Sequence, residues 1–166
     1  MLEIMDYSSR RGVIVPILAK IHAILKENAE KDKTQEPPPH IITWQQDKRK
    51  ELLDINRRYL VALDGNVLSG FFFYRYDGGK IYIEDIQVAW SHRNNPHVID
   101  GFLKKLEFDP GTKDAAFYAS ERVKRDADKE MLASKGFKEE HEGGFEKLGT
   151  FSQASAAIKI RYSKNV

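Results

Sequence analysis

Apolar residues in the first third of the chain recur at three- and four-residue steps, which is the spacing of an amphipathic helix. One such row runs from Ile17 to Asn28 and follows Pro16, a residue type that is common at the first position of a helix. A second row runs from Ile41 to Tyr59, and Thr43 opens a stretch with capping-box spacing. The pattern therefore predicts two helices, the first entered at Pro16 and the second near Thr43.

The pattern then changes to the alternating and continuous apolar runs that are typical of β-strands. Asp64-Gly65-Asn66 and Asp77-Gly78-Gly79 have the composition of tight turns between these runs. Short Gly-containing turns between successive strands predict an antiparallel meander. The expected strands are Leu2 to Tyr7, Tyr59 to Leu63, Val67 to Tyr76 and Ile81 to Ala89.

The second half of the chain alternates between helix and strand patterns. Asn95 and Pro96 are typical of a helix start, and Gly136 of a helix stop. The expected segments are a helix from Pro96 to Leu106, a strand from Ala115 to Ser120, a helix along Val123 to Leu132, and extended segments at Phe137 to His141 and Ala157 to Tyr162. The intervening Glu142 to Ser155 is compatible with a hairpin or with a loop.

The order of these elements predicts an α/β protein with a mixed sheet of six or seven strands, flanked by four helices. The chain of 166 residues is long enough for a core of its own, so residues 1–166 are expected to form one domain. Residues 34–40 carry three consecutive prolines. They are interpreted as a connector inside this domain, because the 33 residues before them are too few for an independent core.

Composition excludes several classes of protein. The chain has no cysteine, which excludes disulfides, Cys-ligated metals and a thiol nucleophile, and fits a cytoplasmic location. Lys and Arg number 27 against 25 Asp and Glu, so no nucleic-acid partner is expected. The longest apolar stretch is too short to span a bilayer and lacks a signal-peptide cleavage site, so no membrane partner is expected either.

Motifs of several common chemistries are absent or incomplete. Gly65 and Gly70 have P-loop spacing, but Phe71 and Phe72 stand where Lys and Ser or Thr are required. The chain has no nucleophile elbow, no zinc-protease motif and no dinucleotide-binding fingerprint. His92 and His97 lack a third ligand nearby in the sequence, so no metal site is predicted.

The segment from Trp90 to His97 joins a predicted strand directly to a predicted helix. Free N–H groups at the start of a helix suit a phosphate, and Arg93 adds a cationic donor. An ordinary capped loop explains the same residues equally well. Both interpretations remain open at this point.

The run Ile83-Glu-Asp-Ile-Gln-Val88, the turn at Arg93, the following helix, the strand near Ala115 and Ser134-Lys-Gly-Phe137 resemble GNAT-type N-acetyltransferases. The order of elements resembles this family over nearly the whole chain. The resemblance implies a GNAT-like fold that holds acetyl-CoA, as co-substrate, in a notch between the fourth and fifth strands. It places the pantetheine arm on the strand end and the pyrophosphate on the following turn. The residues implied in binding are Ile86, Gln87, Val88, Arg93, Asn94, Asn95, His97 and Val98.

This chain departs from the family pattern at several of these positions. Pro96 and Val98 replace the small residues of the turn. Pro96 has no N–H to donate, and Val98 is expected to crowd the approach. Arg125 and Leu132 stand where the family often has an Asn and a Tyr that acts as general acid.

Glu84 lies on the fourth strand, where the resemblance implies a base that deprotonates an amine. Strand alternation predicts that it faces the same side as Ile86 and Val88, opposite Asp85. An ordinary solvated acid explains Glu84 as well. Tyr118 is the remaining candidate for a proton donor.

The resemblance therefore implies an acyl-CoA-dependent N-acetyltransferase that acts on an amine of unknown identity. The alternative is a GNAT-like binding or regulatory module with weak or no catalysis, which the departures at Pro96 and Leu132 favour. A homodimer is compatible with either interpretation.

Overall fold

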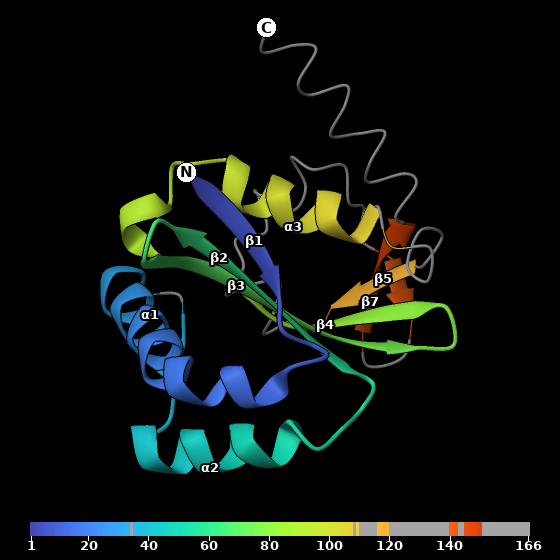
Figure 1. The fold of residues 1–166 in the computed structure, drawn as a ribbon. Helices are drawn as coiled ribbons and strands as arrows, with labels where there is room; N and C mark the ends of the chain where they lie inside the picture. The colour runs from blue at the N-terminus through green and yellow to red at the C-terminus, as the bar shows by residue number, and fades with distance from the viewer. Residues whose placement is uncertain (34, 108, 110–115, 120–139, 143–144, 151–166) are drawn as a thin grey trace, which may run out of the picture.

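The computed structural model describes residues 1–33, 35–107, 109, 116–119, 140–142 and 145–150. Its described part is one sheet with helices on both faces (Figure 1). The strands are β1 (Leu2–Asp6), β2 (Arg57–Asp64), β3 (Val67–Asp77), β4 (Lys80–Val88), β5 (Ala116–Ala119), β6 (Glu140–Glu142) and β7 (Phe145–Thr150). The α-helices are α1 (Leu18–Lys31), α2 (Ile41–Glu51) and α3 (His97–Glu107), and short 3₁₀ turns occupy Arg11–Val13, Val15–Ile17 and Trp90–His92.

The strands lie in the order β1-β2-β3-β4-β5-β7-β6. Pairing from β1 to β4 is antiparallel, which confirms the predicted meander. Gly65, Gly78 and Gly79 have positive φ angles in its two turns, a conformation that other residues adopt at a cost. β4 and β5 are parallel, and β7 and β6 continue antiparallel from β5. The predicted mixed α/β sheet is therefore confirmed.

Two apolar clusters pack against the two faces of this sheet. α3 covers one face, while α1 and α2 lie on the other (Figure 1). Side chains alternate between the two faces along β3 and so contribute to both clusters. Phe72 and Tyr74 belong to the α3 side, and Phe71 and Phe73 belong to the α1–α2 side. All four rings are buried. β3 is therefore packed on both faces, and it pairs along its length with β4.

Both early helices differ at their ends from the prediction. The α-helical hydrogen bonding of α1 begins at Leu18, because a 3₁₀ turn contains Pro16. α2 begins before Thr43, where the His40 side chain accepts a hydrogen bond from the N–H of Ile42. It ends at Glu51, so the predicted continuation of the helical row to Tyr59 is wrong. The later apolar residues of that row lie in a turn and a strand, where tertiary packing overrides local spacing.

The C-terminal predictions are only partly covered by the described residues. The stretch from Glu142 to Ser155 was compatible with a hairpin or with a loop. As far as Thr150 it belongs to a hairpin, because β6 and β7 pair antiparallel. The predicted helix along 123–132, its stop at Gly136 and the extended segment 157–162 lie outside the described residues. Of the helices described here, none has the length and apolar character needed to cross a membrane.

Candidate active site

β4 contains one residue more than its partner β3 in the middle of the sheet. In the register of the two strands Phe73 lies opposite Asp85, and the next residue, Tyr74, lies opposite Ile83. Glu84 is therefore the extra residue of a β-bulge. Bulges bend a strand and redirect its side chains, and they are frequent next to active sites.

The bulge changes which side chains share a face. Ile83 and Ile86 both belong to the apolar cluster under α3, although they are three residues apart. On the opposite face, Glu84 pairs with Arg57 of β2, and Asp85 lines a pocket together with residues of α2. The prediction that Glu84 faces the same side as Ile86 and Val88 is therefore wrong, because the extra residue shifts the alternation by one position.

The described pairing of β4 with β5 reaches the residue before the bulge. Among the described residues, β5 pairs with β4 only from Lys80 to Ile83. On the other edge of β4, the Ala89 N–H donates to the Ser69 carbonyl at 2.9 Å. Antiparallel ladders direct alternate residues to alternate edges, so the N–H and C=O groups of Ile86 and Val88 point away from β3.

One backbone group on this edge of β4 has a side-chain partner from α1. The Val88 carbonyl already accepts a bond of 2.9 Å from the Asn28 side chain. Asn28 also donates to the Gln87 side chain at 2.8 Å, which fixes Gln87 on the α1 side of the sheet. Gln87 therefore supports the strand through α1, while Ile86 and Val88 present backbone groups to the notch.

The Glu84 carboxylate is paired with an arginine from β2. Its Oε2 atom lies 3.3 Å from Nη2 of Arg57, and 28% of the Glu84 side chain remains exposed. Burial raises the pKa of Glu84 above its usual value, and the positive charge of Arg57 opposes part of this rise. A carboxylate with a raised pKa accepts a proton more readily, which is the property that a general base needs.

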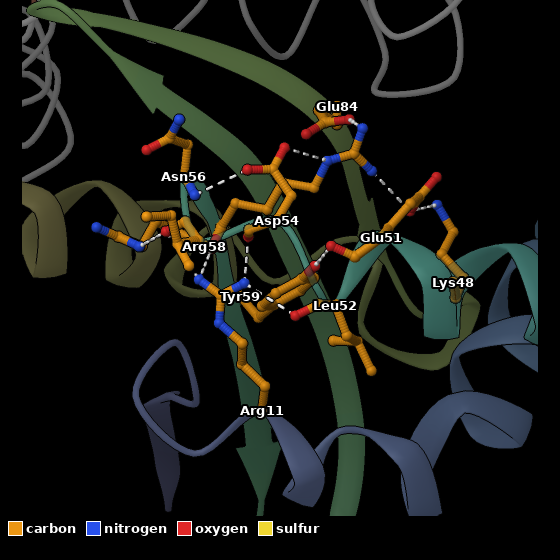
Figure 2. A network of polar contacts seen from close by, with 11 residues as sticks. Arg11, Lys48, Glu51, Leu52, Asp54, Asn56, Arg58, Tyr59 and Glu84 are labelled. Carbon is orange, nitrogen blue, oxygen red and sulfur yellow. Dashed lines mark hydrogen bonds and ion pairs between the residues drawn. The ribbon is translucent and has the colours of Figure 1, made fainter.

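Arg57 also joins Glu84 to the end of α2. Its Nη1 lies 3.1 Å from Glu51 Oε2, and its Nε lies 3.3 Å from Asp54 Oδ2. Lys48 Nζ contacts the same Glu51 oxygen at 2.9 Å. Figure 2 shows the side chains of Glu51, Asp54 and Glu84 close together, and all three form ion pairs with the Arg57 guanidinium. The carboxylate of the bulge is thus held by a network rather than by one contact.

Arg11 fixes the loop that carries this network (Figure 2). Its guanidinium donates to the backbone carbonyls of five residues, and it lies 5.7 Å from the ring centroid of Tyr59. The acceptors are the carbonyl oxygens of Ser8, Leu52, Asp54, Ile55 and Arg57. These bonds join the end of α2 to the start of β2 and so position Arg57.

A pocket of about 370 Å³ lies beside the bulge, between β4, α2 and the proline connector. Trp44 and Pro37 to Pro39 give it an apolar wall. Among the described lining residues, the acidic ones are Glu36, Asp47, Glu51 and Asp85 and the basic one is Lys48. The Lys48 ammonium lies 5.7 Å from the centroid of the Trp44 ring, which shows that this ring accommodates a cation. The lining suits a ligand with positive charge and an aliphatic body.

Comparison of the sequence finds no matching protein-family model and no significantly similar curated protein. Comparison of the structure finds a PaiA N-acetyltransferase from Thermoplasma acidophilum, solved with coenzyme A, at TM-score 0.62 and 15% identity, covering 89% of this chain and 96% of that one. It also finds a spermidine N-acetyltransferase from Vibrio cholerae, solved with CoA and spermine, at 0.61 and 15%, covering 93% and 98%. An acetyltransferase from Desulfovibrio desulfuricans that is assigned to the GNAT family matches at 0.56 and 12%, covering 90% and 97%.

The chain has the GNAT N-acetyltransferase fold. At these identities the likeness establishes the fold, and the chemistry has to be argued from this chain's own residues. The bulge at Glu84 is a feature of its described backbone.

The turn that follows β4 in this GNAT fold is tied down by its own side chains. Nη2 of Arg93 lies 3.1 Å from Oδ2 of Asp32 at the end of α1, and its guanidinium lies 4.5 Å from the Trp90 ring centroid. Asn94 is exposed. Arg93 is thus engaged in an ion pair and a ring contact within the turn.

The start of α3 is capped as predicted, since Asn95 Oδ1 accepts a hydrogen bond of 3.0 Å from the His97 N–H. The His97 side chain is exposed. Val98 is completely buried in the cluster under α3, so the predicted crowding of the turn by its side chain is wrong. Its methyl groups instead fill the space that Gly70 leaves on β3.

Tyr118 lies opposite Tyr82 in the parallel register of β4 and β5. Its side chain, and the family positions at Arg125 and Leu132, lie outside the described residues. The role of proton donor that we considered for Tyr118 therefore stays a prediction.

Sequence analysis missed Asp85, Arg57 and Asn28 as members of the site. A signal for Asp85 was present, because two consecutive acids separate Ile83 from Ile86 in an otherwise alternating strand. Arg57 and Asn28 reach β4 from distant segments, and no spacing rule connects them to it.

Proposed function

We propose that this protein is an N-acyltransferase that moves an acetyl group from acetyl-CoA to a cationic amine. The observation that carries the proposal is the carboxylate-lined pocket beside the bulge of β4, next to the strand edge at Ile86 and Val88 that points away from β3. An extended molecule with secondary amides can pair with such an edge as an added strand would. The pantetheine arm of CoA is a molecule of this kind, and the residues present fit it.

When bound, acetyl-CoA supplies an activated thioester carbonyl. The chain's part is to hold a neutral amine against that carbon, and this positioning is worth several kcal/mol of the barrier. As the new C–N bond forms and the C–S bond breaks, the amine nitrogen loses a proton. Glu84 accepts it, directly or through water, and the leaving thiolate takes a proton from solvent.

The lining of the pocket favours, as acyl acceptor, an amine that carries more than one positive charge. A cation in the pocket meets carboxylates and the face of Trp44, while its aliphatic body contacts Leu25 and the prolines. The Vibrio cholerae structure of the same fold is named for spermidine and holds spermine. A diamine or polyamine is therefore the acceptor class that we propose.

The test is an acyl-transfer assay with acetyl-CoA, followed by mass spectrometry of the amine. Propylamine and 1,3-diaminopropane form a matched pair, since they share a carbon chain and differ in the second ammonium. We expect acetylated product with both, and kcat/KM at least about tenfold higher for the diamine, because a hydrogen bond to a charged group contributes about 1.5–3 kcal/mol and about 1.4 kcal/mol is tenfold. Equal values would contradict the acceptor class.

Absence of product with every amine would contradict the enzymatic proposal itself. It would favour the alternative of a GNAT-like binding or regulatory module.

A further inference from the structure

His22 is a buried ionisable ring on α1 that the proposed mechanism does not use, and 8% of it is exposed. It does not line the pocket itself. Its ring contacts two residues that do, Pro39 and Trp44. Because a buried polar ring is retained at a cost unless it has partners, these two contacts indicate what His22 is there to hold.

The first contact ties the proline connector to α1. Pro37 to Pro39 have no N–H groups, so their backbone can accept hydrogen bonds but cannot donate them. The carbonyl oxygen of Pro39 lies 2.8 Å from Nε2 of His22. Since a carbonyl has no proton to give, Nε2 carries the proton of this bond. The imidazole thus supplies a donor to a segment that has none of its own.

The second contact is with the aromatic part of the same pocket wall. The rings of His22 and Trp44 meet edge to face, with their centroids 5.4 Å apart and their planes at 64°. Such contacts favour one relative orientation of the two rings. Only 6% of Trp44 is exposed. One side chain of α1 therefore touches both the proline segment and the indole of the wall.

From these contacts we infer that His22 is a positioning residue for the acyl acceptor. It holds Pro39 and Trp44 where they contact the aliphatic body and the second ammonium of a diamine. The inference rests on the proposed function and adds to it a residue that sets the affinity for the amine without touching the amine. Because His22 acts through the wall of the pocket, its loss should raise the KM for the acceptor and leave kcat unchanged.

Two substitutions separate the hydrogen bond from the bulk of the ring. His22→Gln places an amide N–H near the position of Nε2, whereas His22→Leu fills a similar volume without a donor. Both lose the aromatic contact with Trp44, so the comparison isolates the bond to Pro39. Circular dichroism checks the fold of each variant. If His22→Leu does not fold, His22→Asn takes its place, because its shorter amide does not reach Pro39.

The fluorescence of Trp44 reports binding of the amine without any need for turnover. The chain has two tryptophans, so Trp90→Phe leaves Trp44 as the fluorescent one. In this background, titration with 1,3-diaminopropane should give a Kd for His22→Gln within about twofold of the parent. The Kd of His22→Leu should be about three- to tenfold higher, the effect of one hydrogen bond. Equal Kd values for the two variants overturn the inference.

Steady-state acetylation of the same diamine gives the second readout. We expect the KM of His22→Leu to rise by the same factor as its Kd, while kcat stays within about twofold of the parent. A lower kcat with an unchanged KM overturns the positioning role.

The outcomes also separate this inference from the proposed function. Acetylated product with equal KM values for His22→Gln and His22→Leu overturns the role of His22 and leaves the N-acyltransferase standing. A weaker Kd in His22→Leu, without product from any amine, overturns the enzyme and leaves His22 as a residue that shapes an amine-binding pocket. No response of Trp44 to the diamine, together with no product, overturns both.

Discussion

Glu84 and Asp85 are adjacent in the chain, yet both lie on the α1–α2 face of the sheet, because Glu84 is the extra residue of the bulge in β4. Glu84 pairs with Arg57, whereas Asp85 is 6% exposed and lines the pocket. The site therefore contains two carboxylates with different surroundings. This difference separates a proton acceptor from a residue that binds the amine.

Substitution of each carboxylate distinguishes the two roles. Glu84→Gln keeps the shape but cannot accept a proton, so kcat should fall about 10²- to 10⁴-fold at neutral pH. The loss should shrink at high pH, where more of the amine is already neutral. Asp85→Asn should mainly raise the KM for the amine. Steady-state kinetics from pH 6 to 9 decide this, and equal rates for wild type and Glu84→Gln would remove Glu84 from the mechanism.

The pH profile tests the influence of Arg57. Glu84 accepts a proton only when ionised, so activity should be lost as the pH falls through its raised pKa. Arg57 lowers the pKa of Glu84, and Arg57→Ala should therefore move the acid limb of kcat/KM to higher pH. Arg58→Ala is the matched control on the same strand. If the acid limb of the kcat/KM profile of Arg57→Ala lies at the same pH as in the wild type, the influence of Arg57 on Glu84 is contradicted.

The close approach of β3, β4 and α3 is predicted to limit substitution at Gly70. A Cβ atom there would lie 2.8 Å from the Gln87 carbonyl oxygen and 2.8 Å from a Val98 methyl group. Gly70→Ala should reduce the free energy of unfolding by about 1–3 kcal/mol, as overpacking usually does. Gly12→Ala meets nothing within 4 Å and serves as control. Urea denaturation of both variants measures the difference, and an unchanged midpoint in Gly70→Ala would contradict the packing.

Restoring a donor at the turn should strengthen the binding of CoA. Pro96→Gly adds one backbone N–H at the start of α3, which is worth about 1–2 kcal/mol in contact with phosphate, less the entropy that glycine adds. Pantetheine should bind as before, because it has no pyrophosphate. Calorimetry with both ligands checks this. An equal gain for pantetheine would mean that the substitution acts on the strand edge instead.

Local patterns predicted most of the sheet and little of the site. The meander followed from two Gly-containing turns, since their backbone conformations leave few alternatives. The bulge was encoded in the spacing of Ile83 and Ile86, but strict alternation placed Glu84 on the wrong face. The ion pairs of Arg57 and Arg93 join segments up to 61 residues apart, and no local rule could predict them.

The edge of β4 that faces away from β3 at Val88 is the central feature of this account, and Val88→Pro tests it most directly. Proline removes the Val88 N–H, which points away from β3, so the described hydrogen bonds between β3 and β4 are kept. Val88→Ala is the control, since it shortens the side chain and keeps the N–H.

The measurement is the rate of acetyl transfer from acetyl-CoA to 1,3-diaminopropane, with circular dichroism to confirm that both variants are folded. We predict that the rate of Val88→Ala stays within about threefold of the wild-type rate. The rate of Val88→Pro should fall at least about tenfold, because one hydrogen bond between uncharged groups is lost and its acceptor is left desolvated. Equal rates for folded Val88→Pro and Val88→Ala would contradict the assignment of the donor to this edge.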